Sequence, residues 1–433
     1  MNTKTDRSTE LNPSSPETLR GALRAVPMLP GMQDFLPDAS EGSRAVYQTA
    51  VSFLAESGFQ RVDTPVLEDS ELFVRKGGGE LTGLLYTFND PGGNRVSLRP
   101  EFTSSVIRLF IENPGSGLPL RWCYGGPVFR YDRHGGQCRQ FTQVGAEIIG
   151  ADGVDVDANL IATTLKGLRR MGVNGAVARV GHIEAFTRIF AAFDLSDSSR
   201  RFVAGNLGRL KRGQTDAEQL SARASEAGLV GVNEEGVNGQ GVNGEGVNGD
   251  QPEPDSGPGS QELLAELNLM LNGDAQGPTG RRTPGEILAR LERKSTQPRD
   301  PVELDRALDV ASKLVRLEGS PDETVKAARA LLIESGAVEA GASSDALAPL
   351  QELIQALRDS GVSNGELVVD MGLARGMAYY TGPIFDLATP QSLRTLGGGG
   401  RYDGLVQTLG GPNTATLGFA YDMESVASAA GVN

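Results

Sequence analysis

The residues with the clearest capacity for chemistry lie between positions 375 and 404. Arg375 is followed by the pair Tyr379-Tyr380 and, after a short gap, by four glycines and Arg401. A guanidinium and two phenol hydroxyls can bind polar ligand groups, and glycines let backbones approach closely. Together these residue types indicate the wall of a polar small-molecule pocket. Taken singly, each is better explained by a strand, a tight turn or a surface arginine.

A second polar group lies on a predicted strand in the first half of the chain, at residues 139–149. Gln143, Gly145 and Glu147 alternate with aliphatic residues there, so they share one face of that strand. Such a strand either lines a polar cavity or turns its polar face to water.

Composition limits the class of protein. The 433 residues suffice for two or three domains, and the net charge of −14 argues against a large nucleic-acid surface. Cys123 and Cys138 lack the spacing of a zinc site or a disulfide scaffold, so we expect no metal and two free thiols. Free thiols fit a reducing, cytoplasmic setting. No run approaches the ~18 apolar residues of a membrane span.

The element pattern predicts an α+β domain that is interrupted by a helical insertion. Residues 1–26 are expected to form a disordered tail, and residues 27–190 the first part of the core. Residues 191–360 are expected to be a mostly helical insertion, and residues 361–433 the second part of the core. Within the insertion, repeated Gly-Val-Asn units at 229–259 predict a disordered linker.

Several individual elements are predicted from periodicity and turn residues. Helices are expected at 43–57, from Arg99-Pro100-Glu101 onward, and at 154–171, 261–271, 302–317, 322–334 and 347–359. Strands are expected at 61–67, 85–88, 95–98, 122–124, 127–131, 139–149, 176–180, 366–371, 381–387 and 416–421.

Five separated motifs, in order, resemble the catalytic domain of class II histidyl-tRNA synthetases. They occupy residues 98–103, 129–147, 375–380, 397–404 and 417–420. The resemblance runs from about residue 29 to residue 427 and is specific because the motifs recur together. It implies a mixed, mainly antiparallel six-stranded sheet flanked by helices, usually in a dimer.

The resemblance also implies a histidine-binding pocket made of Glu101, Thr103, Arg130, Gln143, Glu147, Arg375, Tyr379 and Tyr380. The α-ammonium of an amino acid needs oxygens such as those of Glu101 and Gln143. Glu147 and a tyrosine hydroxyl suit the imidazole nitrogens, and Arg375 could form a fork to the carboxylate. In a synthetase, Arg130 would hold the α-phosphate of ATP. The alternatives are an exposed strand face for Gln143 and Glu147, and solvated surface or a structural ion pair for Arg130.

The chain departs from the synthetase pattern at several positions. The usual last-motif arginine is replaced by Ser425, which follows Glu424 and carries no charge for ATP phosphates. Ala378 stands where an acid usually precedes the tyrosine pair, and Asp132 replaces a glutamate. The sequence reaches Asn433 soon after the last core motif, so we expect no anticodon-binding domain of the kind that synthetases carry. These departures make tRNA charging and catalysis by this chain unexpected.

One family fits both the match and the departures. The chain resembles the regulatory subunit of ATP phosphoribosyltransferase, which shows a similar Gly181-His182 segment before a helix. This resemblance implies a non-catalytic partner of the short-form catalytic subunit in the first step of histidine biosynthesis. It also implies feedback inhibition by L-histidine, a homodimer within a hetero-oligomer, and no cofactor, metal, membrane or tRNA.

Three hypotheses remain open at this point. Histidine could use the synthetase-like pocket or an interface site in a regulatory subunit. The chain could instead be a truncated histidyl-tRNA synthetase or a histidine-adenylating enzyme, as Arg130 and Arg375 would favour. It could also be an interaction module whose pocket no longer binds a ligand.

Overall fold

The computed structural model describes residues 26–115, 117–131, 138–227, 229, 301–337, 345–373, 379–389 and 395–432; for residues 77–82 and 301 only the backbone is described. Several features named from the sequence therefore lie outside the described residues: the tail through residue 25, nearly all of the linker at 229–259, the helix at 261–271, Asp132, Arg375 and Ala378.

The described helices and strands alternate in the first half of the chain, and helices dominate from 183 to 359. The helices are α1 (Pro37–Glu56), α2 (Ser70–Thr82), α3 (Thr103–Glu112), α4 (Val154–Arg170), α5 (Ile183–Ala191), α6 (Asp197–Lys211), α7 (Ala217–Glu226), α10 (Pro301–Leu314), α11 (Pro321–Glu334), α12 (Ala348–Asp359), α13 (Gly404–Thr408) and α14 (Met423–Ala429). The strands are β1 (Gln60–Arg61), β2 (Leu67–Asp69), β3 (Tyr86–Asn89), β4 (Arg95–Leu98), β5 (Leu120–Phe129), β6 (Gln140–Ile149), β7 (Val177–His182), β8 (Glu318–Gly319), β9 (Leu367–Asp370), β10 (Pro383–Ala388), β11 (Gly397–Arg401) and β12 (Thr416–Asp422).

The main sheet has nine strands in the described residues, so the expectation of six is wrong. Their order is β1-β5-β6-β12-β11-β10-β7-β9-β8. The six central strands in this order, β5-β6-β12-β11-β10-β7, are antiparallel to one another. Outside them, β1 pairs in parallel with β5, and β9 pairs in parallel with β7. The number six came from the family resemblance. Of the three additional strands, β1 and β8 have two residues each, too few for any periodic signal, whereas β9 matches the strand predicted at 366–371. The sheet is therefore mixed and mainly antiparallel, as expected.

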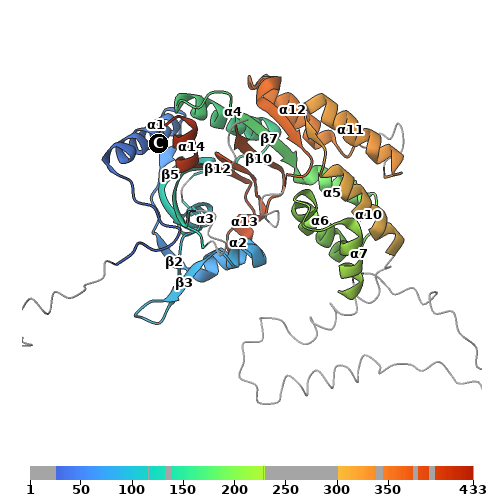
Figure 1. The fold of residues 1–433 in the computed structure, drawn as a ribbon, viewed down its shortest axis with the longest axis horizontal. Coiled ribbons are helices and arrows are strands. Elements are labelled where there is room, and N and C mark those ends of the chain that lie inside the picture. Colours follow the sequence, from blue (N-terminus) through green and yellow to red (C-terminus); the bar gives the residue numbers. More distant parts are fainter. Residues whose placement is uncertain are drawn as a thin grey trace, which may run out of the picture.

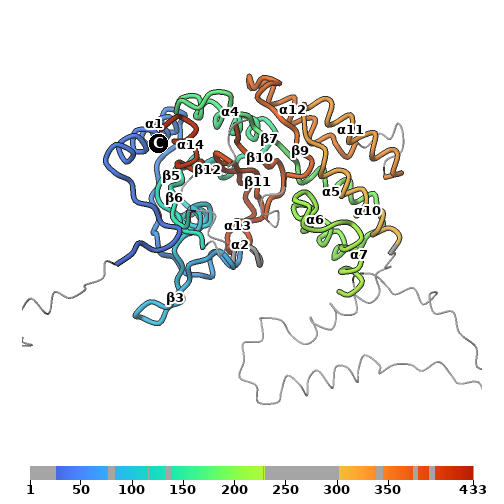
Figure 2. The backbone as a smooth tube through the Cα atoms, in the orientation of Figure 1, coloured from blue at the N-terminus to red at the C-terminus, as the bar shows by residue number. Residues whose placement is uncertain are grey.

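Each face of this sheet carries its own apolar core. On one face, aliphatic side chains of β6 pack with α1, α4 and α14, which Figure 1 shows along the outer side of the sheet. On the other face, Phe102, Val106 and Phe110 of the α3 region pack against Trp122 and Tyr124 of β5, and α13 joins them. Figure 2 shows β6, β12 and β11 side by side between these layers.

The helices from α5 to α12 form most of the right half of Figure 1. Here α10 packs against α6, α7 and α11, while α12 packs on α4 and α5. The helices from α6 to α12 fall in the stretch predicted to be mostly helical, whereas α5 precedes it and ends at its first residue, Ala191. None of the helices in the described ranges is long and apolar enough to cross a membrane.

Several local predictions need correction. Helix α1 begins at Pro37, six residues before the predicted start, because proline is well placed in a first turn. The predicted strand at 61–67 is absent between β1 and β2, where Pro65 interrupts the run. Helix α3 begins at Thr103, so Pro100 lies before it. The two predicted strands at 122–131 are one continuous strand, β5.

Candidate functional site

The polar face of β6 is buried rather than turned to water. Glu147 has no exposed surface and Gln143 is 8% exposed, while Val144, Ala146 and Ile148 belong to the core on the opposite face. The predicted alternation along this strand is thus confirmed. The side-chain oxygen of Gln143 is buried and has no hydrogen-bond partner among the residues that the structure describes. Buried polar atoms are normally satisfied, so this orphaned acceptor indicates a site that a ligand or water completes.

Glu147 accepts hydrogen bonds from three hydroxyl groups. Thr103 Oγ1 donates to Oε1 over 2.8 Å, Tyr124 donates to the same oxygen over 3.0 Å, and Tyr402 donates to Oε2. Burial raises the pKa of Glu147 to about 8, although the hydrogen bond from Thr103 partly offsets it. Burial and the nearby carboxylate also raise the pKa of Tyr124, which keeps its hydroxyl protonated as a donor. The carboxyl group of Glu147 is therefore held in place and close to neutrality.

Glycines make room for this carboxyl group. A Cβ atom at Gly418 of β12 would lie 1.5 Å from Glu147 Oε2, and one at Gly145 would lie 2.6 Å from the Tyr124 hydroxyl. In β11, a Cβ at Gly399 would lie 2.0 Å from the carbonyl oxygen of Gly418. The glycine cluster thus lets backbones approach closely, as its composition indicated.

Glu101 is the second buried carboxylate of the site. Its Oε2 lies 3.1 Å from Lys76 Nζ, and Ser104 donates to Oε1 through both its backbone N–H and its hydroxyl. Burial alone would raise the pKa of Glu101, but the charge of Lys76 and the Ser104 hydrogen bonds outweigh it, so the pKa is lowered. Glu101 thus remains ionised at neutral pH while Glu147 tends toward its neutral form.

Three tyrosines form an aromatic cluster beside these carboxylates. The rings of Tyr379 and Tyr380 are 4.3 Å apart, and each lies about 6 Å from the ring of Tyr402. Lys76 Nζ lies 4.5 Å from the ring centre of Tyr379, within cation–π range. Since Tyr402 contacts Glu147 and Lys76 contacts Glu101, the tyrosine pair lies against the partners of both carboxylates.

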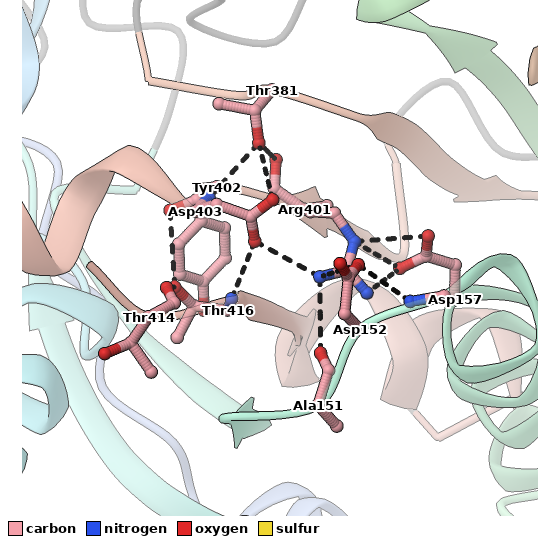
Figure 3. A network of polar contacts seen from close by, with 10 residues as sticks. Ala151, Asp152, Asp157, Thr381, Arg401, Tyr402, Asp403, Thr414 and Thr416 are labelled. Atoms are coloured by element: carbon pink, nitrogen blue, oxygen red, sulfur yellow. Dashed lines mark hydrogen bonds and ion pairs between the residues drawn. The ribbon is translucent and has the colours of Figure 1, made fainter.

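A buried arginine holds the segment that carries Tyr402. Arg401 Nε donates to Asp157 of α4 over 2.9 Å, and Arg401 Nη1 donates to Asp403 over 3.1 Å (Figure 3). The same Asp403 oxygen accepts the backbone N–H of Thr416, and Tyr402 N–H donates to the Thr416 carbonyl. Burial raises the pKa of Asp157 to about 6, despite its hydrogen bond to Arg401. This network fixes the end of β11 against α4 and β12, and so sets the position of Tyr402.

The predicted phosphate side of the site lies at the end of β5 and the start of α14. Arg130 follows β5, donates through Nε to the Pro100 carbonyl and lies over the Phe141 ring. The backbone N–H of Thr142 donates to both carboxylate oxygens of Glu424, over 3.0 and 2.9 Å. Ser425, in the first turn of α14, offers no positive charge beside them.

The structure brings six of the eight predicted pocket residues into this region: Glu101, Thr103, Gln143, Glu147, Tyr379 and Tyr380. Arg130 lies at the adjoining end of β5, and Arg375 lies outside the described residues.

The sequence reasoning missed Lys76, Tyr124 and Tyr402. For Tyr124, the alternation of the predicted strand at 122–124 gave a usable signal, because β5 pairs with β6. No sequence signal pointed to Lys76, because the charged stretch around it resembles the solvated face of a helix. In the described part of the chain, no group of three or more His, Cys, Asp or Glu side chains could hold a metal ion.

Comparison with known proteins places this geometry in a family. A family model described as histidyl-tRNA synthetase matches residues 31–228 and 285–426. The chain is 28% identical over 400 residues to histidine–tRNA ligase of Pyrococcus horikoshii, covering 91% of this chain and 73% of that protein. It is 29% identical over 398 residues to the ligase of Thermococcus kodakarensis, covering 91% and 72%.

Solved structures show the same fold. A histidine–tRNA ligase subunit from Alicyclobacillus acidocaldarius is similar with a TM-score of 0.57 and 25% identity, covering 94% of this chain and 98% of that one. A Bacillus halodurans structure, named as an ATP phosphoribosyltransferase regulatory subunit/histidyl-tRNA synthetase, has a TM-score of 0.60 at 20% identity, covering 93% and 82%. The nine-stranded sheet with its flanking helices is therefore a class II synthetase-like α+β fold. With the family model matching most of its length, the chain belongs to the histidyl-tRNA synthetase family.

Proposed function

We propose that this chain binds histidine and acts as the regulatory subunit of a short-form ATP phosphoribosyltransferase, without activating histidine itself. The observation that carries the proposal is the contrast between the two sides of the site. The amino-acid side keeps two buried carboxylates, Glu101 and Glu147, with opposite pKa shifts. On the phosphate side, Glu424 accepts backbone hydrogen bonds and its neighbour is the uncharged Ser425.

The chemistry of adenylation explains why this contrast matters. Transfer to the α-phosphate of ATP develops charge that preorganised cations stabilise, and loss of one such donor typically lowers the rate about 10²- to 10³-fold. Binding an amino acid needs no such stabilisation. A site that keeps its carboxylates but has Ser425 in place of the last-motif arginine is therefore better suited to sensing than to catalysis. The name of the Bacillus halodurans structure joins the same two functions.

A reconstitution assay tests the regulatory role. The full chain is mixed with a short-form ATP phosphoribosyltransferase catalytic subunit from the same source, and product formation is followed with and without L-histidine. We expect activity that requires this chain and falls as histidine is added, because histidine would favour one conformation of the complex. A catalytic subunit that is equally active without this chain would refute the proposal.

A binding assay tests the pocket itself. Titration calorimetry with L-histidine is compared for the wild type, Glu147→Ala and the matched control Glu226→Ala, whose residue lies exposed at the end of α7. We expect Glu147→Ala to lose affinity, because the imidazole loses the carboxyl group that would form a hydrogen bond with its ring, and the control to bind as the wild type does. Unchanged affinity in Glu147→Ala would place histidine at another site, such as the subunit interface.

A second candidate function is histidine activation, favoured by the relatives named histidine–tRNA ligase and by Arg130 at the end of β5. Histidine-dependent exchange of pyrophosphate into ATP measures it directly. We expect no exchange even at high protein concentration. Exchange that depends on histidine and disappears in Arg130→Ala would establish the enzyme instead.

A further inference from the structure

A buried lysine occupies the polar site. Lys76 of α2 is 6% exposed, and lysines are rarely buried unless their charge is paired. Its ammonium lies 3.1 Å from Glu101 Oε2 and 4.5 Å from the ring centre of Tyr379. The lysine therefore satisfies Glu101 electrostatically in the ligand-free chain.

The position of this ammonium matches the one that an amino-acid ligand requires. Glu101 is the carboxylate assigned to the α-ammonium of the ligand, and its other oxygen is occupied by the Ser104 hydroxyl over 2.5 Å. Lys76 Nζ and a ligand α-ammonium are both primary ammonium groups that would compete for Oε2. Two such cations at one buried carboxylate repel each other, so they exclude one another from the position.

We infer that Lys76 is an internal competitor for the α-ammonium of the ligand, so that ligand binding releases Lys76 from Glu101. This inference rests on the proposed binding of histidine at this site. The lysine has a flexible four-carbon stem that can carry its charge to solvent once it is displaced. Lys76 belongs to α2, which packs against α3 and α13. Release of Lys76 would therefore change the contacts of the helices that cover the site when the ligand binds.

The arrangement also determines which ligands are sensed. A ligand with an α-ammonium replaces one ion pair at Glu101 by another. A ligand with the imidazole ring but no amino group leaves the Lys76 pair intact. Histidine and imidazolepropionate, its analogue without the amino group, should therefore differ in their effect on Lys76 even when both fill the ring position beside Glu147.

Chemical labelling of the wild-type chain tests this directly. Lysines are acetylated briefly, and modification of Lys76 is measured by mass spectrometry relative to the exposed Lys313, which corrects for reagent consumed by the ligand. We expect Lys76 to be protected in the free chain and in saturating imidazolepropionate. In saturating histidine its labelling should rise about 10-fold or more, as expected when a charge-assisted hydrogen bond is lost.

The outcomes separate the two proposals. If histidine binds by calorimetry and Lys76 stays protected, the competitor role is wrong while the pocket stands. If calorimetry detects no histidine binding, the proposed function fails at this site, and the competitor role fails with it.

A variant gives an independent readout. In Lys76→Met the competitor is absent, so histidine should bind about 10- to 100-fold more tightly, whereas imidazolepropionate should gain nothing. The control Lys313→Met, on the surface of α10, should bind both ligands as the wild type does. Weaker histidine binding in Lys76→Met would show that the lysine assists the ligand and would overturn the inference.

Discussion

The buried carboxyl group of Glu147 should make the stability of the chain depend on pH in a defined direction. Its pKa is raised from 4.5 to about 8 by burial, so the folded chain favours the protonated form. This contribution to stability is complete below pH 4.5 and is lost as the pH rises through about 8. Since one pH unit corresponds to 1.36 kcal/mol, ionising the folded site costs about 5 kcal/mol in all.

The variant Glu147→Gln removes the titration and keeps the size of the side chain. In the wild type, the hydroxyl groups of Thr103 and Tyr124 donate to the carboxyl group, and in the variant they can donate to the amide oxygen instead. Between pH 5.5 and pH 8, the free energy of unfolding of the wild type should therefore fall by about 3 kcal/mol relative to the variant. Comparing the two proteins cancels the titration of all other groups.

Urea unfolding at a series of pH values measures this difference, with Glu226→Gln as the exposed control. The control should follow the wild type at every pH. Wild-type and Glu147→Gln curves that run parallel from pH 5.5 to pH 8 would refute the reasoning, because they would mean that the buried carboxyl group titrates as it does in the unfolded chain. A difference of opposite sign would show that the three hydroxyl donors stabilise the charged form.

Two further substitutions probe the support of the site. Gly418→Ala places a Cβ 1.5 Å from a carboxylate oxygen of Glu147, so it should destabilise the fold by about 1–3 kcal/mol and weaken histidine binding. The control Gly205→Ala lies in open space on α6 and should leave the melting temperature unchanged or raise it. Equal melting temperatures for the two alanine variants would contradict the close packing. Arg401→Met leaves the buried carboxylate of Asp157 on α4 unpaired, so the free energy of unfolding in urea should fall by about 3–5 kcal/mol. Arg61→Met breaks an exposed ion pair and should lower it by only about 0–1 kcal/mol. A small effect at Arg401 would mean that the network of Figure 3 does not hold the strand.

Much of the fold could be predicted where periodicity is strong. The helix at 154–171 is observed as Val154–Arg170, and the strand pair near 85–98 is observed as β3 and β4. Prediction failed where local propensity carries no signal. Strand β11 is a run of glycines, which disfavour strands in isolation, and only close packing against β10 and β12 makes it extended.

The candidate site shows the same limit. Alternation along 139–149 predicted that Gln143 and Glu147 share a face, because neighbouring residues of one strand fix that relation. It could not decide between water and a buried site, since that depends on α3 and α13 covering the face. Contacts between distant segments were not predictable either, such as Lys76 with Glu101 or Tyr402 with Glu147.

The two buried carboxylates indicate how the proposed site can be stable both without and with histidine. In the free chain, Glu101 is neutralised by Lys76 and Glu147 tends toward its protonated form, so neither leaves an uncompensated charge in the interior. Histidine carries both compensating groups, an ammonium for Glu101 and a ring with two nitrogens for Glu147. Because one ammonium replaces another at Glu101, this carboxylate keeps a partner in both states, and the exchange can be weakly favourable and reversible, as a sensor requires. A synthetase could share this step, so the two functions diverge at the phosphate side, where Ser425 follows Glu424.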